Sequence, residues 1–271
     1  MTNTTNCARV LALLPMLCAA AACDSDADAE GEGTLRVTIY GEDFIEDRVP
    51  ADEVIDGWEV VFTRFLVAVH DVEADGIAMD GTWVYDLRPS SGGNGHDVAS
   101  MPMPAGTVEH LDYRIGPASS DATGNVDAQT ISAMADAGYS LWVQGTATRD
   151  DVTLTFDWGF ATDTAYTQCE TGQDLADGGE ATSQMTIHSD HLLYDDLESE
   201  EPNVAFDIIA RADTDGDGDG DITLEELAAV DITGEARYQV GSRDITEMRS
   251  FIAAQTATVG HIDGEGHCET K

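Results

Sequence analysis

Apolar residues recur at every second position through much of this chain, and this period restricts the fold more than any other feature of the sequence. Successive side chains of a β-strand point to opposite faces, so the period predicts strands with one buried face. The polar segment Thr148–Asp151 between two of them predicts a hairpin. The predicted strands are residues 35–39, 58–62, 65–69, 83–87, 111–115, 139–145, 152–160 and 182–188.

Short strands of this kind, separated by Gly, Pro and Asp, predict a mainly β fold, and we expect a β-sandwich. The sequence shows no internal repeat and no long linker in its body. We therefore expect residues 34–271 to form one β-rich domain. The segment 166–180 is rich in Gly, Asp and Glu, and a division into two lobes is expected there if the domain divides at all.

Helices are expected to be few. One is predicted over Asp127–Ala137, because Asp127 is a good N-cap and Gly138 a good stop signal. A C-terminal helix is predicted over Asp244–Ala254, where apolar residues share one helical face.

The most informative stretch for function is an acidic run of twelve residues that begins at Asp215. Asp215, Asp217 and Asp219 place carboxylates at alternate positions, and Gly220 allows a sharp turn after them. A hard dication such as Ca²⁺ takes about six to eight oxygen ligands at roughly 2.3–2.6 Å. Alternating carboxylates on a short loop are typical of a site for this ion.

This stretch resembles the EF-hand loop family, with Ile222 at the apolar position. The resemblance implies that Asp215, Asp217 and Asp219 are ligands. It also implies that Asp221 coordinates through its carbonyl, Thr223 through water and Glu226 through both carboxylate oxygens.

A frame that starts two residues earlier, at Asp213, fits less well, because it puts Leu224 where the glutamate belongs. We predict a calcium loop within residues 213–226, between an entering helix over Pro202–Ala212 and an exiting helix over Leu224–Val230. A single loop favours an ion that stabilises the fold over a calcium sensor, since sensors couple paired hands. The alternative is a solvated linker rich in Asp and Gly.

The start of the chain predicts export. Residues 1–22 contain Arg9 and a short apolar run, which is typical of a signal peptide. The run ends in three alanines and Cys23, and it resembles the lipobox of bacterial lipoproteins, although Ala20 stands where that family prefers Leu. The resemblance implies a lipid on Cys23 and a location on the bacterial cell envelope outside the cytoplasm. Cleavage by an ordinary signal peptidase near the same place is the alternative. Residues 23–33 are expected to be an acidic tether.

Five cysteines are present, and their positions predict one disulfide. Cys7 and Cys18 would leave with the signal peptide, and Cys23 would carry the lipid. Cys169 and Cys268 remain, and in an oxidising compartment we expect them to be bonded to each other.

The charge of the chain excludes one class of partner. The chain has 12 basic and 53 acidic residues, for a formal net charge of −41. Proteins that bind nucleic acid need clustered Lys and Arg, whereas the only lysine here is Lys271. We therefore expect no nucleic-acid partner, and the sequence indicates no particular protein partner.

Histidines offer a second candidate metal site. His188 and His191 lie three residues apart, and His261 and His267 precede Cys268. If these side chains met, they could hold zinc or copper, which imidazole suits. The alternative is that they are hydrogen-bonded polar residues at strand ends.

No nucleophile elbow, no His-Glu-x-x-His motif and no phosphate-binding glycine loop is present, so binding is favoured over catalysis. Three hypotheses therefore remain: a calcium-stabilised lipoprotein with a structural or interaction role, a transition-metal protein of the envelope, and a metal-assisted secreted hydrolase. The body, in particular Val67–Val72 and Leu111–Ile115, is similar to β-sandwich domains of uncharacterised bacterial lipoproteins. That resemblance implies no activity.

Overall fold

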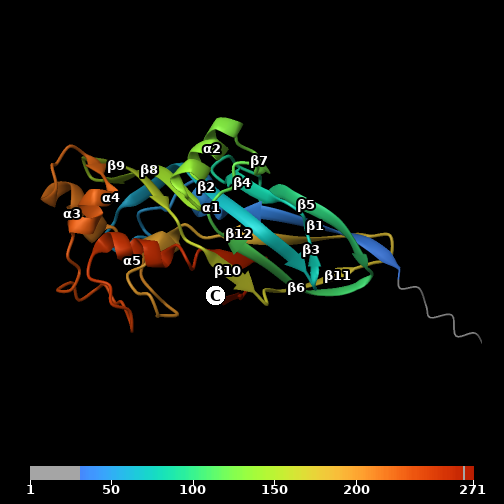
Figure 1. The fold of residues 1–271 in the computed structure, drawn as a ribbon. Helices are drawn as coiled ribbons and strands as arrows, with labels where there is room; N and C mark the ends of the chain where they lie inside the picture. Colours follow the sequence, from blue (N-terminus) through green and yellow to red (C-terminus); the bar gives the residue numbers. More distant parts are fainter. Residues whose placement is uncertain (1–30, 265) are drawn as a thin grey trace, which may run out of the picture. The chain divides into compact units, whose positions relative to one another are not determined.

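Two β-sheets form the framework of the chain in a computed structural model, which describes residues 31–264 and 266–271 (Figure 1). These residues belong to one unit, Gly31–Lys271. The predicted signal peptide, Cys23 and most of the predicted tether lie outside the described residues. Among the residues described, no helix is both long enough and apolar enough to cross a membrane.

The smaller sheet has four strands in the order β14-β12-β1-β5. Strand β1 pairs in parallel with β12 and antiparallel with β5, whereas β14 lies on the other side of β12. The bounds are Glu32–Tyr40 for β1, His96–Pro104 for β5, Glu180–Ile187 for β12 and Gly260–Ile262 for β14.

The larger sheet has eleven strands within the described residues, and its main path runs β13-β9-β8-β2-β6-β10-β15. The bounds along this path are Asp221–Ile222 (β13), Val152–Phe160 (β9), Leu141–Arg149 (β8), Glu59–Ala74 (β2), Gly106–Ile115 (β6), Thr164–Thr167 (β10) and Glu269–Thr270 (β15). Off this path are β3 (Ile77–Ala78), β4 (Thr82–Asp86), β7 (Thr123–Gly124) and β11 (Glu170–Leu175).

Strand β2 explains why the apolar positions of the sequence pattern change from even to odd residue numbers. The predicted strands 58–62 and 65–69 are parts of this one strand, and the register against β8 shifts between Phe62 and Arg64. A bulge adds one residue to one strand of a pair and so turns the next side chains to the opposite face. Phe62 and Phe65 therefore both reach the main core.

Both sheets contribute to one large core. Leu35 and Ile39 of the smaller sheet belong to the same buried cluster as Val67 and Trp158 of the larger sheet. A smaller cluster on the opposite face of β2 contains Leu66 and is covered by helix α2 (Ala128–Ala137). The prediction of a mainly β, sandwich-like fold is confirmed.

The predicted caps of α2 are also confirmed. Asp127 accepts a hydrogen bond from the Thr130 amide, and Gly138 takes a left-handed conformation with a φ of 69°. The hairpin between β8 and β9 is present, with Arg149 opposite Val152. Strand β5 was not predicted, because Pro102 and Pro104 weaken its sequence pattern. Proline is tolerated there because β5 lies at a sheet edge.

The remaining helices are α1 (Glu42–Glu46), the 3₁₀ helix η1 (Asp190–Leu193), α3 (Asp207–Asp215), α4 (Leu224–Ala229) and α5 (Met248–Gln255). Helix α4 agrees with the prediction, but two predicted helix starts were wrong. Helix α3 begins after Val204, which makes β-bridges to Val54 and Tyr194. Helix α5 begins after Glu247, whose side chain accepts a hydrogen bond from Ser250 N.

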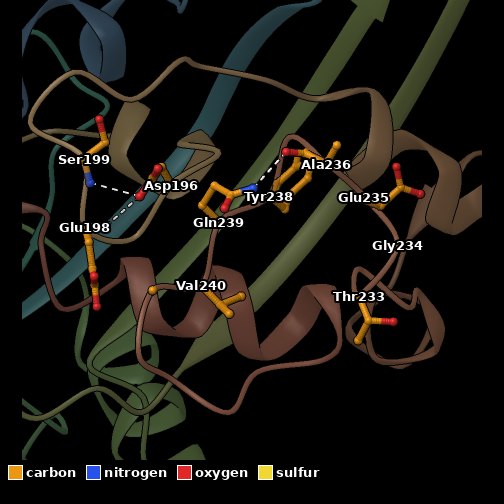
Figure 2. A pocket seen from close by; sticks show the side chains of 11 residues that line it. Asp196, Glu198, Ser199, Thr233, Gly234, Glu235, Ala236, Tyr238, Gln239 and Val240 are labelled. Carbon is orange, nitrogen blue, oxygen red and sulfur yellow. Dashed lines mark hydrogen bonds between the residues drawn. The ribbon is translucent and has the colours of Figure 1, made fainter.

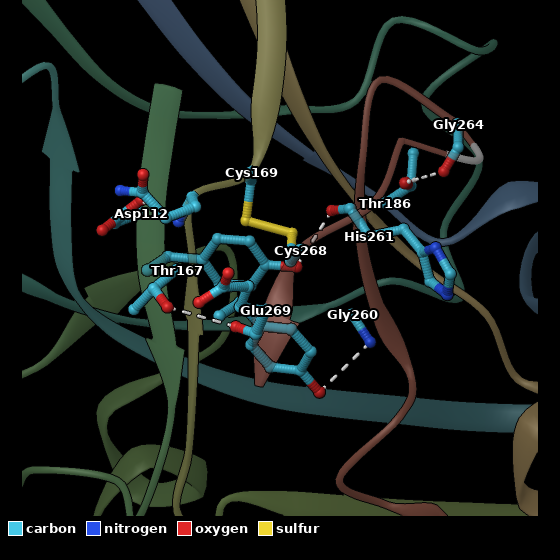
Figure 3. The surroundings of a disulfide bond; sticks show 12 residues. Asp112, Thr167, Cys169, Thr186, Gly260, His261, Gly264, Cys268 and Glu269 are labelled. Atoms are coloured by element: carbon cyan, nitrogen blue, oxygen red, sulfur yellow. Dashed lines mark hydrogen bonds between the residues drawn. A yellow bond between two sulfur atoms is a disulfide. The ribbon is translucent and has the colours of Figure 1, made fainter. Parts of the chain in front are cut away.

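The segment 166–180 is part of the sheets, because β10 and β11 both pair with β6. Between these two strands lies Cys169, which forms the predicted disulfide with Cys268 (Figure 3). The S–S distance is 2.09 Å, and the two cysteines are 99 residues apart in the sequence.

Candidate metal centres

The acidic loop connects α3 to α4, and both helices pack into the main core through Ile209 and Leu227. Helices α3, α4 and α5 lie close together (Figure 1). Thr223 is the N-cap of α4, and it forms a reciprocal capping box with Glu226. The chain leaves the loop at a well-defined helix start.

Three carboxylates of the loop converge. Asp213, Asp217 and Asp219 each offer an oxygen within 4.8 Å of the other two. Asp213 is 7% exposed, whereas Asp217 and Asp219 are exposed. The amide of Gly220 donates a hydrogen bond of 2.7 Å to Asp213 Oδ1, so the loop folds back over this carboxylate. Such a cluster of oxygens suits a hard divalent cation.

The structure and the sequence prediction place different aspartates in the cluster. Asp215 lies in the last turn of α3, with its Oδ2 3.3 Å from Arg211 Nε. The carboxylate of Asp221 accepts a hydrogen bond of 2.6 Å from Thr155. Asp213 therefore lies beside Asp217 and Asp219, a position that the sequence frame assigned to Asp215. The sequence signal for Asp213 was the two-residue spacing of aspartates, which begins there.

Glu226 turns its carboxylate back into the loop. Its Oε2 accepts a hydrogen bond of 2.9 Å from Thr223 N, and its Oε1 accepts one of 3.3 Å from Asp217 N. The backbone hydrogen bond from Thr223 is the main cause that lowers the pKa of Glu226. Glycine suits position 216, because a Cβ there would lie 2.1 Å from Glu226 Oε1 and 2.8 Å from the Ala212 carbonyl oxygen, and so would displace this carboxylate.

The loop is attached to the larger sheet through β13. Asp221 and Ile222 pair in parallel with β9, and Ile222 is fully buried. Trp158 Nε1 donates a hydrogen bond of 2.7 Å to the Ile222 carbonyl, and Thr155 N donates one of 2.8 Å to Gly220 O. One side of the loop is therefore held against a rigid strand.

Histidines form the second centre, where β12 ends beside β14. His188 follows β12, His191 lies in η1 and His261 lies in β14. The ring centroids are 4.5 Å apart for His188 and His261, 5.1 Å for His191 and His261, and 5.4 Å for His188 and His191. His188, Asp190 and His191 each offer a ligand atom within 4.8 Å of the other two.

Neighbouring groups orient these side chains. His191 Nδ1 lies 3.0 Å from Thr258 Oγ1, and Tyr194 donates a hydrogen bond of 2.8 Å to Asp190 Oδ2. His188 Nδ1 lies 3.7 Å from a carboxylate oxygen of Glu42. Burial, together with the nearby imidazoles, lowers the pKa of His191 to about 3. A neutral imidazole is the form that binds a metal ion.

His267 is placed differently from the other three histidines. It is exposed, and with His191, Tyr194 and His261 it lines a cavity of about 260 Å³. His267 therefore lies at the edge of the centre, whereas the rings of the other three histidines, His188, His191 and His261, contact one another.

A larger, open hollow of about 700 Å³ lies between the segments 196–199 and 233–241 (Figure 2). Asp196 Oδ1 accepts hydrogen bonds from the amides of Glu198 and Ser199, so this carboxylate is occupied by its own turn. Among the described residues that line the hollow there is no histidine or cysteine. Within that part of the chain, Ser199 therefore has no imidazole base beside it in this hollow.

Comparison of the chain with protein-family models, curated proteins and solved structures found no match. The fold and the sites define a mainly β, disulfide-bonded chain with acidic groups that can hold a metal ion.

Proposed function

We propose that this protein is a calcium-binding protein of the bacterial cell envelope, anchored by a lipid on Cys23, in which the ion stabilises the fold. The observation that supports calcium most directly is the convergence of Asp213, Asp217 and Asp219 in a loop that also holds the Glu226 carboxylate. The role that follows is structural, or it is the presentation of a surface to a partner outside the cytoplasm.

The proposed ligands are the carboxylates of Asp217, Asp219 and Glu226, together with the carbonyl of Asp221. Asp213 completes the set in the observed loop, and Asp215 completes it in the sequence frame. Oxygens of this number and kind suit Ca²⁺ better than Mg²⁺, which demands a smaller and more regular shell. Both versions of the site share Asp217, Asp219 and Glu226, so these residues test the proposal.

Electrostatics give the ion its stabilising effect. At 4.8 Å, the largest separation between ligand oxygens in this cluster, two carboxylates repel each other by about 1 kcal/mol in water and by about 3 kcal/mol at an effective dielectric constant of 20. Asp217 and Asp219 are exposed, so the lower value applies to that pair. A bound dication replaces this repulsion with attraction in the folded state only.

A static role fits the position of the loop. Sensors with this kind of loop couple two hands, whereas here β13 pairs with β9 of the larger sheet. Helices α3 and α4 are packed into the main core, so an opening movement would expose Ile209 and Leu227. The ion would therefore hold the loop against the sheet.

The test is thermal unfolding with and without Ca²⁺ at millimolar concentration, a range in which extracellular sites of this kind bind. We expect Ca²⁺ to raise the Tm of the wild-type protein. At 100 times Kd, the gain in unfolding free energy is about 2.7 kcal/mol. Glu226→Gln should remove most of this gain, because it deletes the charge yet keeps a side chain that can form the capping box.

Glu225→Gln is the matched control, since Glu225 is the exposed neighbour of Glu226 and its substitution changes the net charge equally. This variant should respond to Ca²⁺ like the wild type. No change in the wild-type Tm, or an equal loss of response in both variants, would refute the calcium site.

A further inference from the structure

His188, Asp190 and His191 offer ligand atoms within 4.8 Å of one another at the end of the smaller sheet, and the ring of His261 contacts both histidines from a segment far away in the sequence. His188 and Asp190 follow β12, whereas His261 comes from β14, which pairs with β12. His188 is 6% exposed, and Asp190, His191 and His261 are half-buried, so the group lies at the edge of the protein interior. The acidic loop contributes none of these residues, so this centre is separate from the proposed calcium site.

The spacing of the rings distinguishes between coordination geometries. A histidine nitrogen binds zinc at about 2.0–2.1 Å, which puts the ring centroid about 3.2 Å from the ion. Two such rings have centroids about 5 Å apart in a tetrahedral site and more than about 6 Å apart when opposite each other in a square plane. The observed separations are 4.5, 5.1 and 5.4 Å. The two longer separations fit the tetrahedral arrangement, the shortest corresponds to a narrower angle of about 90°, and none reaches the separation of opposite ligands in a square plane.

The hydrogen bonds of His191 determine which nitrogen faces an ion. Thr258 Oγ1 donates its only hydrogen to the Gln255 carbonyl, at 2.9 Å. The same oxygen can therefore only accept from His191 Nδ1, at 3.0 Å. This places the proton on Nδ1 and the lone pair on Nε2. Metal-binding histidines are oriented in this way by a partner on the other nitrogen.

The strand that carries His261 is held by two stacked tyrosines. Tyr113 donates a hydrogen bond of 2.9 Å to the His261 carbonyl, and Tyr166 accepts one of 3.2 Å from Gly260 N. Only glycine fits at position 260, because a Cβ would lie 2.6 Å from Tyr113 Oη. The backbone of His261 is thus fixed before any ion binds, which lowers the cost of ordering the site.

We propose that His188, His191, His261 and Asp190 form a tetrahedral site for a zinc-like divalent transition-metal ion. Three nitrogens and one oxygen are a ligand set that zinc accepts, and Tyr194 orients the carboxylate. The cavity beside His191 and His261 offers a path for the ion, with His267 at its edge.

The test uses the full chain in excess Ca²⁺, so that the acidic loop is occupied, and measures binding of Zn²⁺ by calorimetry and of Co²⁺ by its visible spectrum. We expect one Zn²⁺ per chain and the intense visible bands of tetrahedral Co²⁺. His191→Ala should weaken Zn²⁺ binding by at least about 100-fold, because it removes a direct ligand. Tyr194→Phe should weaken it by about 10-fold, because it only frees Asp190 to rotate.

His110→Ala is the matched control, because His110 also lies near a carboxylate, 4.0 Å from Asp75, but belongs neither to the proposed ligands nor to the lining of the cavity beside them. This variant should bind Zn²⁺ like the wild type, and unfolding curves should show that all variants are folded. Wild type that binds neither ion, or variants of His191 and His110 that bind equally, would overturn the proposal. Glu226→Gln should retain Zn²⁺ binding, so failure of one metal site is distinguishable from failure of the other.

Discussion

The disulfide offers a prediction whose size follows directly from the structure. Cys169 and Cys268 are 99 residues apart, and their bond ties the segment before β11 to the segment before β15. In the chain-entropy model, closing a loop on the order of 100 residues restricts the unfolded chain by about 4.7 kcal/mol at 25 °C. For a domain of this size, 1 kcal/mol shifts Tm by about 2–4 °C. Removing the bond should therefore lower Tm by roughly 10–20 °C.

The assay is urea unfolding of the double variant Cys169→Ala/Cys268→Ala, beside wild type that is oxidised or reduced. The comparison of oxidised with reduced wild type keeps the side chains identical, so it isolates loop closure from the packing of the buried Cys169. We expect both the reduced protein and the variant to lose several kcal/mol. The urea dependence of the free energy should also steepen, because the unfolded chain becomes less compact. A loss below about 1 kcal/mol in a folded, reduced protein would refute the reasoning.

Two further predictions concern the anchor and the tyrosines. Cys23→Ser should release the protein from the membrane fraction, which blotting of separated membrane and soluble fractions would check; an unchanged membrane fraction would reject the lipid anchor. Burial, with a contribution from Asp97, raises the pKa of Tyr85 to about 12. Because this side chain stays protonated in the folded state above the unfolded pKa of about 10, stability should be lost as pH rises from about 10 to 12. Tyr85→Phe should make this loss smaller in unfolding measurements across that range, and an unchanged slope would count against the burial effect.

Local signals account for much of the fold. Alternating residues predicted the strands that have one buried face, and Asp127 and Gly138 predicted both ends of α2. These features depend on neighbours within a few residues, so they can be read from the sequence. Strands such as β5 escaped prediction, since an edge position tolerates prolines that local rules exclude.

The acidic loop shows what short-range sequence patterns do not predict. Its composition identified a stretch that can bind a cation, but the sequence frame put Asp215 among the ligands. In the structure, α3 continues to Asp215, and Asp213 lies in the cluster instead. The end of a short helix depends on the packing of its buried face against the core, which the spacing of aspartates does not encode.

The sequence by itself determined most of the longer strands, the cysteine pair and the presence of an acidic loop, because each of these follows from composition and short-range order. Only the tertiary structure decided that His261 lies beside His188, which precedes it by more than seventy residues. Pairing of β12 with β14 sets Thr186 opposite His261 and so carries the imidazoles to one place. Contacts of this kind depend on strand register and on the core that selects the register. The sequence around a histidine is the same whether or not a partner strand places a second histidine beside it.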